Sequence, residues 1–388
     1  MQSTVLERQP EPESTVPAPE ATQESVPKTR TARLVSLDAF RGLTVLLMLL
    51  VNNIALDTQT PAQLMHAGWN GGVTIADLVF PWFLLCVGLA IPLSTASAKK
   101  RGVPNWRHEL RIVVRAALLI AIGCLLESAT EKKPVFSMGV LQLIGFAYLI
   151  GAWLSDLSKK RRIIISFAML LVFGMALKYF PVPGAAPGAY SETANWPAYM
   201  NTTFFGRYNL EGILSAIPTG ALVLLGTVFG DYLLDRQKTP IQWMTFSSIS
   251  GLIMITAGII WNLSLPYSKT LWTPSYILFS GGLGLLVLTV LYLTTDAAKK
   301  TKWATPLVIF GSNAIVAYTV PIFVKLTILS VWTVKTPTGT EGMLDHTLHL
   351  LKGSMGNFAG GWIYTISYIT IWGLVLWALY SKKIFIRV

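Results

Sequence analysis

A cluster of polar residues stands between two long apolar runs, in the segment MHAGWNGGVTIADLVFPWF at 65–83. An imidazole can take a proton from an attacking group and return it to a leaving group, which makes His66 a candidate general base. Asn52 closes the preceding run, and an Asn amide can donate a hydrogen bond to a developing oxyanion. Asp77 stands one turn inside the next run, where an ionisable residue indicates a functional site because its burial is costly. The three residue types predict a catalytic cluster.

Two neighbours of His66 are candidates for binding a substrate. Trp69 can stack on a sugar or an adenine face, although Trp is also the usual anchor at a membrane interface. Asn70 follows it in the same stretch, and we assign both residues to binding. A structural interpretation stays open, in which His66 faces water and orients a turn.

Other polar residues fall inside or at the edges of apolar runs. We assign seven of them to binding of substrate or cofactor: Asp38, Arg41, Arg115, Gln142, Glu211, Ser312 and Asn313. Glu127, near the end of the third run, is a further polar residue of this kind, to which we assign no role. Each could instead make an interhelical hydrogen bond or fix the topology. Together they predict a polar cavity that reaches both membrane faces.

The chain that must position these residues is rich in apolar residues. Of its 388 residues, 53% are hydrophobic and 13% are charged, and the mean hydropathy is +0.54. Apolar runs of about 20 residues, the length that crosses a bilayer, recur along it and do not alternate as barrel strands would. They predict an all-α integral membrane bundle of ten transmembrane helices, at 41–57, 73–97, 111–128, 137–155, 162–180, 210–234, 241–263, 273–295, 303–330 and 358–381. Residues 1–30, rich in Pro, Glu, Ser and Thr, predict a disordered cytoplasmic tail ahead of a membrane domain at 31–388.

The net charge of +12 reflects membrane topology rather than nucleic-acid binding, because the basic residues lie in short loops. One set of loops with the flanking run ends holds 22 Lys and Arg residues, and the opposite set holds 8. The positive-inside rule therefore predicts that both termini are cytoplasmic and that His66 lies outside.

Cysteine and histidine usage gives no reason to expect a metal. Cys86 and Cys124 both lie inside apolar runs and have neither a zinc spacing nor a disulfide framework. His346 and His349 stand three residues apart beside Asp345, which could hold a metal ion, but an amphipathic segment on the outer face explains them better. We expect no metal.

Six blocks follow one another along the chain: RLVSLDAFRGLTVLLMLLVNN, HAGWNGGVTIADLVFPWF, GVLQLIGFAYL, LEGILSAIPTGALVLLG, LWTPSYILFSGG and GSNAIVAYTV. In this order they resemble the heparan-α-glucosaminide N-acetyltransferase family and its bacterial relatives, and the resemblance runs from about 33 to 381. Two positions depart from the family pattern: Leu143 stands where Arg is usual, and Asn209-Leu210 where Asp-Pro is usual.

The resemblance implies that acetyl-CoA from the cytosol supplies an acetyl group to an amino sugar or glycan acceptor on the outer face. It implies that His66 is catalytic, as general base or as a covalent acetyl carrier, and that Asn52 lies near the thioester. Asp77 would orient the histidine or a neighbouring helix. The protein would lie among the lipids of a bacterial inner membrane, as a possible homodimer. A membrane transporter for amino sugars of the N-acetylglucosamine type is the second hypothesis.

Overall fold

The computed structural model describes residues 34–388 except 70–71, 186–189, 236, 338 and 387–388. The predicted tail at 1–30 and the candidate binding residue Asn70 lie outside the described residues.

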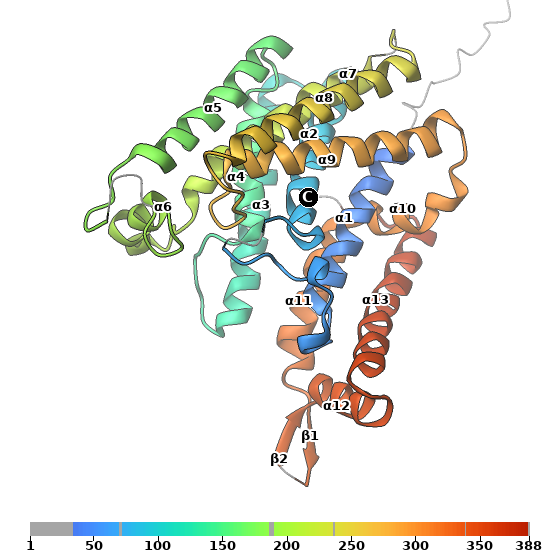
Figure 1. Cartoon of the computed structure of the whole chain (residues 1–388). Helices are drawn as coiled ribbons and strands as arrows, with labels where there is room; N and C mark the ends of the chain where they lie inside the picture. Colours follow the sequence, from blue (N-terminus) through green and yellow to red (C-terminus); the bar gives the residue numbers. More distant parts are fainter. Residues whose placement is uncertain (1–33, 70–71, 186–189, 236, 338, 387–388) are drawn as a thin grey trace, which may run out of the picture. The chain divides into compact units, whose positions relative to one another are not determined.

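The described chain is almost entirely helical (Figure 1). Its long helices are α1 (Val35–Asn53), α2 (Ile75–Lys100), α3 (Asn105–Glu131), α5 (Lys159–Tyr179), α7 (Ala216–Leu234), α8 (Pro240–Asn262), α9 (Pro274–Tyr292) and α13 (Asn357–Ser381). Its shorter helices are α4 (Val140–Trp153), α6 (Trp196–Met200), α10 (Thr305–Ser312), α11 (Ala314–Val324) and α12 (Met343–Met355). Strands β1 (Thr333–Thr336) and β2 (Gly339–Gly342) pair antiparallel, with Thr333 opposite Gly342. This hairpin departs from the predicted all-α fold because it is a local turn outside the apolar runs.

Eight described helices are long and apolar enough to cross a membrane, which supports an integral membrane protein. A ninth crossing is possible if Lys302–Ser312 and Ala314–Leu329, bent by 59° at Asn313, form one broken span. The predicted range 137–155 holds only the 14 residues of α4, too few for a full crossing. Each predicted range thus contains a helix or a helix pair, while the number of ten crossings and the side of the termini stay predictions.

Local sequence signals fix where the helices begin. Helix α8 begins at a capping box, in which the Gln242 N–H donates to Thr239 Oγ1 at 3.2 Å and the Thr239 N–H donates to Gln242 Oε1 at 3.0 Å. Pro240 occupies its first position, where a missing N–H is harmless. Helix α2 begins the same way, at Thr74 and Asp77.

The core forms where α2 packs against α7. Both helices are buried over most of their length. They approach closely at two glycines: a Cβ on Gly226 would lie 2.9 Å from the Cα of Gly88. Helices α1, α10 and α13 contact one another beside this core, and α12 packs on the beginning of α13 (Figure 1).

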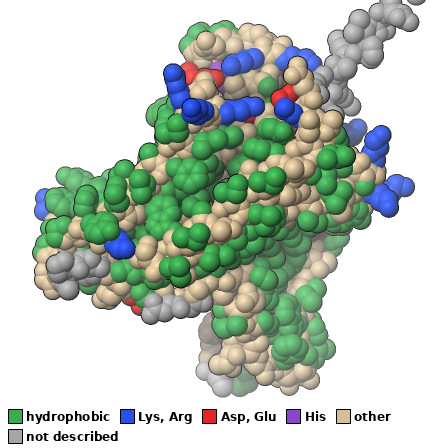
Figure 2. All heavy atoms as spheres, turned by 45° about the horizontal axis from the view of Figure 1, so that its top comes forward, with side chains coloured by type: hydrophobic (Ala, Val, Ile, Leu, Met, Phe, Trp, Pro, Cys, Tyr) green, Lys and Arg blue, Asp and Glu red, His purple; other side chains and the backbone are tan. Residues whose placement is uncertain are grey.

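The outside of the described bundle is apolar. Exposed large hydrophobic residues lie along α3, α5, α8 and α13, as expected for helices that face lipid. Figure 2 shows this hydrophobic surface, with Lys and Arg side chains gathered mainly above it.

Candidate active site

His66 lies in the loop between α1 and α2, which includes two short 3₁₀ turns, Asp57–Gln59 and Ala62–Leu64. The loop is fastened to the beginning of α2. The Thr74 hydroxyl donates to the Met65 carbonyl at 2.8 Å, and the Ala67 N–H donates to Asp77 Oδ2 at 3.1 Å. These two bonds hold His66 from both sides.

The Asp77 carboxylate joins the helix cap to the histidine. Its Oδ2 accepts hydrogen bonds from the N–H groups of Ala67 and Thr74 and from the Thr74 hydroxyl at 3.0 Å. Its Oδ1 lies 2.9 Å from His66 Nδ1. The Asp77 side chain is 2% exposed, whereas that of His66 is 51% exposed. A buried carboxylate on Nδ1 favours the tautomer with the proton on that atom, which leaves Nε2 with the lone pair.

A lysine from a distant segment completes this cluster. Lys269, in the loop between α8 and α9, places its Nζ 3.5 Å from Asp77 Oδ1. The same atom lies 2.9 Å from Nδ1 and 3.2 Å from Nε2 of His66. Burial lowers the pKa of the Lys269 ammonium, and the nearby Asp77 carboxylate opposes this shift.

These residues open into a cavity of about 490 Å³, within the size range of small-molecule sites. The cavity lies between the His66 loop, the C-terminal part of α3, the beginning of α4 and the α8–α9 loop. Its lining includes His66, Trp69, Asp77, Phe80, Glu127, Gly139, Leu143, Ser215, Tyr267, Ser268, Lys269 and Trp272. The cavity is therefore mixed in character, with charged groups on an otherwise aromatic and apolar wall.

Trp69 lines the cavity and packs against a second aromatic ring. Its ring centroid lies 5.4 Å from that of Tyr190, whose hydroxyl donates to the Pro266 carbonyl at 3.1 Å. Burial raises the pKa of Tyr190 to about 12, so it stays a neutral donor.

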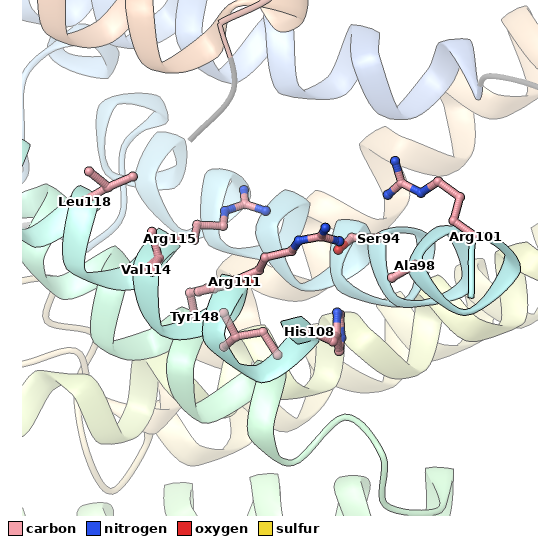
Figure 3. A pocket seen from close by; sticks show the side chains of 10 residues that line it. Ser94, Ala98, Arg101, His108, Arg111, Val114, Arg115, Leu118 and Tyr148 are labelled. Atoms are coloured by element: carbon pink, nitrogen blue, oxygen red, sulfur yellow. The ribbon is translucent and has the colours of Figure 1, made fainter. Parts of the chain in front are cut away.

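A second hollow of about 280 Å³ lies between α2, α3 and α4. Figure 3 shows Arg111 and Arg115 reaching from α3 toward Ser94 on α2, with Arg101 extending from the end of α2. The Arg115 guanidinium stacks over the Tyr148 ring at 4.7 Å, and its Nε has no hydrogen-bond partner among the described residues. A concave site with three guanidinium groups suits an anion.

The remaining predicted residues do not all reach these two hollows. Asn52 is exposed at the end of α1 and does not line the His66 cavity. Glu211 is also exposed and does not line it, although the next residue, Gly212, does. Gln142 is buried between α3 and α4, with its Oε1 unpartnered among the described residues. Leu143, the first departure from the family pattern, lines the His66 cavity.

Four predicted binding residues have structural contacts near the chain termini. Asp38 and Arg41 lie 3.8 Å apart on the first turns of α1. Ser312 donates to the Ile309 carbonyl at 2.8 Å. Asn313 holds the C-terminal segment, donating to the Ile384 carbonyl at 3.0 Å and accepting from the Ile386 N–H at 2.8 Å.

His346 and His349 both face Glu341, and His346 Nδ1 lies 3.1 Å from Glu341 Oε2. These contacts join α12 to β2. No group of three or more His, Cys, Asp and Glu side chains in the described ranges is arranged to hold a metal ion.

Sequence reasoning missed Lys269 as a member of the site, because it counted this residue only as a loop charge. A signal was present, since Lys269 stands two residues before the family-like block LWTPSYILFSGG, which begins at Leu271.

The fold and the site define a helical integral membrane protein with a carboxylate–imidazole–ammonium cluster in an open cavity. The chain belongs to the heparan-alpha-glucosaminide N-acetyltransferase family, whose catalytic-region model matches residues 33–266. It is similar to the heparan-alpha-glucosaminide N-acetyltransferase of Homo sapiens, with 28% identity over 92% of this chain and 60% of the relative. It is also similar to the Mus musculus protein of the same name, with 26% identity over 93% of this chain and 62% of the relative. The chain thus spans about three fifths of the length of these relatives.

Proposed function

We propose that this protein is a membrane acetyltransferase that transfers the acetyl group of acetyl-CoA to the amine of an amino sugar or glycan. The single observation that carries the proposal is the 2.9 Å contact between His66 Nδ1 and the buried Asp77 carboxylate, at the wall of a ligand-sized cavity. Membership of a family whose relatives are named acetyltransferases supports it, and gives the transporter hypothesis no support.

His66 acts as the general base. Asp77 holds the Nδ1–H tautomer, so Nε2 takes a proton from the acceptor amine as the amine nitrogen attacks the thioester carbon. The carbon–sulfur bond breaks, and His66 returns the proton to the sulfur of the leaving CoA. In the covalent variant Nε2 itself attacks and carries the acetyl group to the amine.

The basic hollow at Arg101, Arg111 and Arg115 suits the phosphates of acetyl-CoA. Arg115 and Glu127, which line the two hollows, are twelve residues apart on α3. At a rise of 1.5 Å per residue this is about 18 Å, a distance that an extended pantetheine arm can cover.

Glu127 supports the proposal that the acceptor is an amine, because it lines the same cavity as His66. A carboxylate there favours an acceptor with an amino group, because it can pair with the ammonium form before deprotonation. Trp69 offers an aromatic face for the sugar ring. Asn52 stays a proposed oxyanion donor and would have to move into the cavity to act.

The proposal includes the orientation of the protein in the membrane. The basic end, with both termini, faces the cytosol and receives acetyl-CoA, and the His66 cavity opens on the outer side of a bacterial inner membrane. Charge counts support this arrangement, and the possible homodimer stays a prediction.

Proteoliposomes test both activity and orientation. Labelled acetyl-CoA is supplied on one side and glucosamine on the other, and the orientation is measured by labelling Cys introduced at Ala185 or Lys100. We expect acetylglucosamine only when acetyl-CoA is on the Lys100 side. Transfer only when acetyl-CoA is on the Ala185 side would overturn the orientation, and no transfer in either arrangement would overturn the activity.

A further inference from the structure

Lys269 places a positive charge beside the imidazole ring of His66. Its Nζ lies within 3.2 Å of both ring nitrogens. The Asp77 carboxylate, 3.5 Å away, holds the ammonium in position, and the Lys269 side chain is only 30% exposed. A fixed ammonium in a partly dry site interacts with a developing charge more strongly than one in water.

Acyl transfer requires a hydrogen-bond donor at a position such as that of Lys269. As an acceptor attacks the thioester, negative charge develops on the carbonyl oxygen and requires a donor. Asn52, which the sequence suggests for this task, is exposed and does not line the cavity. Lys269 lines it and lies beside the atom that takes the proton.

We propose that Lys269 is a catalytic residue whose ammonium stabilises the oxyanion formed on the acetyl carbonyl. This inference rests on the proposed acetyl transfer. The acceptor nitrogen forms a bond to the carbonyl carbon, and the carbonyl electron pair moves to oxygen, where Lys269 donates a hydrogen bond. The pair then returns, the carbon–sulfur bond breaks, and the amine proton passes through His66 to the sulfur. Lys269 keeps its protons throughout, and Asp77 keeps its charge.

Kinetics give the first test. Lys269→Met should lower kcat by about 10²–10³-fold and leave both KM values nearly unchanged, because the lost interaction exists only in the transition state. Lys269→Arg should keep more activity than Lys269→Met, because it keeps a cationic donor. Lys133→Met, which removes an exposed lysine after α3, is the matched control and should retain the wild-type rate. Unchanged kcat in Lys269→Met, or a loss confined to KM, would overturn the assignment.

A spectroscopic measurement separates this inference from the proposed function. The probe is a ¹³C-carbonyl acetyl-CoA analogue in which a methylene replaces the sulfur, so it cannot transfer its acetyl group. Bound to the wild-type protein, its carbonyl stretch should lie at lower wavenumber than when bound to Lys269→Met, because the ammonium polarises the bond. Equal frequencies in the two proteins would overturn the role of Lys269 while leaving acetyl transfer intact. Failure of the wild-type protein to bind the analogue would overturn the proposed function, and this inference with it.

Discussion

The hydroxyl of Tyr276 donates a hydrogen bond to the backbone carbonyl of Asp77 at 2.5 Å. In a regular helix that carbonyl would accept from the N–H four residues later, but that residue is Pro81, which has no N–H. Tyr276, fully buried on α9, therefore supplies the bond that the proline removes. The contact ties α9 to the turn of α2 that carries the Asp77 carboxylate.

Tyr276→Phe should lower the free energy of unfolding by about 1–3 kcal/mol, because it leaves a buried carbonyl without its donor. Denaturant titration in detergent micelles measures this. The loss should shrink in a Pro81→Ala background, where the restored N–H can satisfy the carbonyl. The matched control is Tyr208→Phe, at a residue 66% exposed, which should have little effect. An equal loss in both backgrounds would contradict this role of Tyr276.

Asp77→Asn should lower kcat by roughly 10²–10⁴-fold, because an amide can no longer hold the Nδ1–H tautomer of His66 by charge. The amide oxygen can still accept from Ala67 and Thr74, so the beginning of α2 should persist. Transfer kinetics measure the expected loss of kcat, and circular dichroism measures whether the helix persists. A folded variant with wild-type kcat would show that the carboxylate only caps the helix.

Glu127→Gln should raise the KM for an amine acceptor about tenfold, because a charge-assisted hydrogen bond to the ammonium is lost. The KM for acetyl-CoA should not change. Glu131→Gln, four residues later and exposed at the end of α3, is the matched control. Equal acceptor KM values in wild type and Glu127→Gln would show that this carboxylate does not bind the acceptor.

Arg115→Gln should raise the KM for acetyl-CoA about tenfold and weaken its dependence on salt, since one guanidinium no longer pairs with a phosphate. The comparison is Arg107→Gln, also on α3 but outside the basic hollow, where Arg107 stacks on Trp106. If both variants bind acetyl-CoA like wild type, the basic hollow is not the donor site.

The apolar runs predicted where helices lie because run length and hydropathy are local properties. They did not show that the run 303–330 is broken at Asn313, whose side chain bonds to the C-terminal segment 71 and 73 residues away. The predicted range 137–155 was also longer than the helix it contains. It included irregular residues before the 14 residues of α4.

The candidate site was predictable only where its residues are near in sequence. His66, Trp69 and Asp77 lie within three turns of one another and line one cavity. Lys269 is 203 residues from His66, so only folding shows that they meet. Asn52 illustrates the converse, because its closeness in sequence does not bring it into the lining.

The catalytic role of His66 is the central claim, and two other histidines provide controls. His346→Ala and His349→Ala alter residues that pair with Glu341 at the hairpin, away from the cavity lining. Both should transfer acetyl groups at the wild-type rate.

The decisive measurement compares acetyl-CoA binding and acetyl transfer in His66→Ala. Calorimetry should give an affinity near that of wild type, because His66 lies in the loop cavity and not in the basic hollow. Transfer from labelled acetyl-CoA to glucosamine should fall by about 10²–10⁴-fold, since the base is gone. Transfer at the wild-type rate by His66→Ala would contradict the account and leave the cluster around Asp77 as a structural turn.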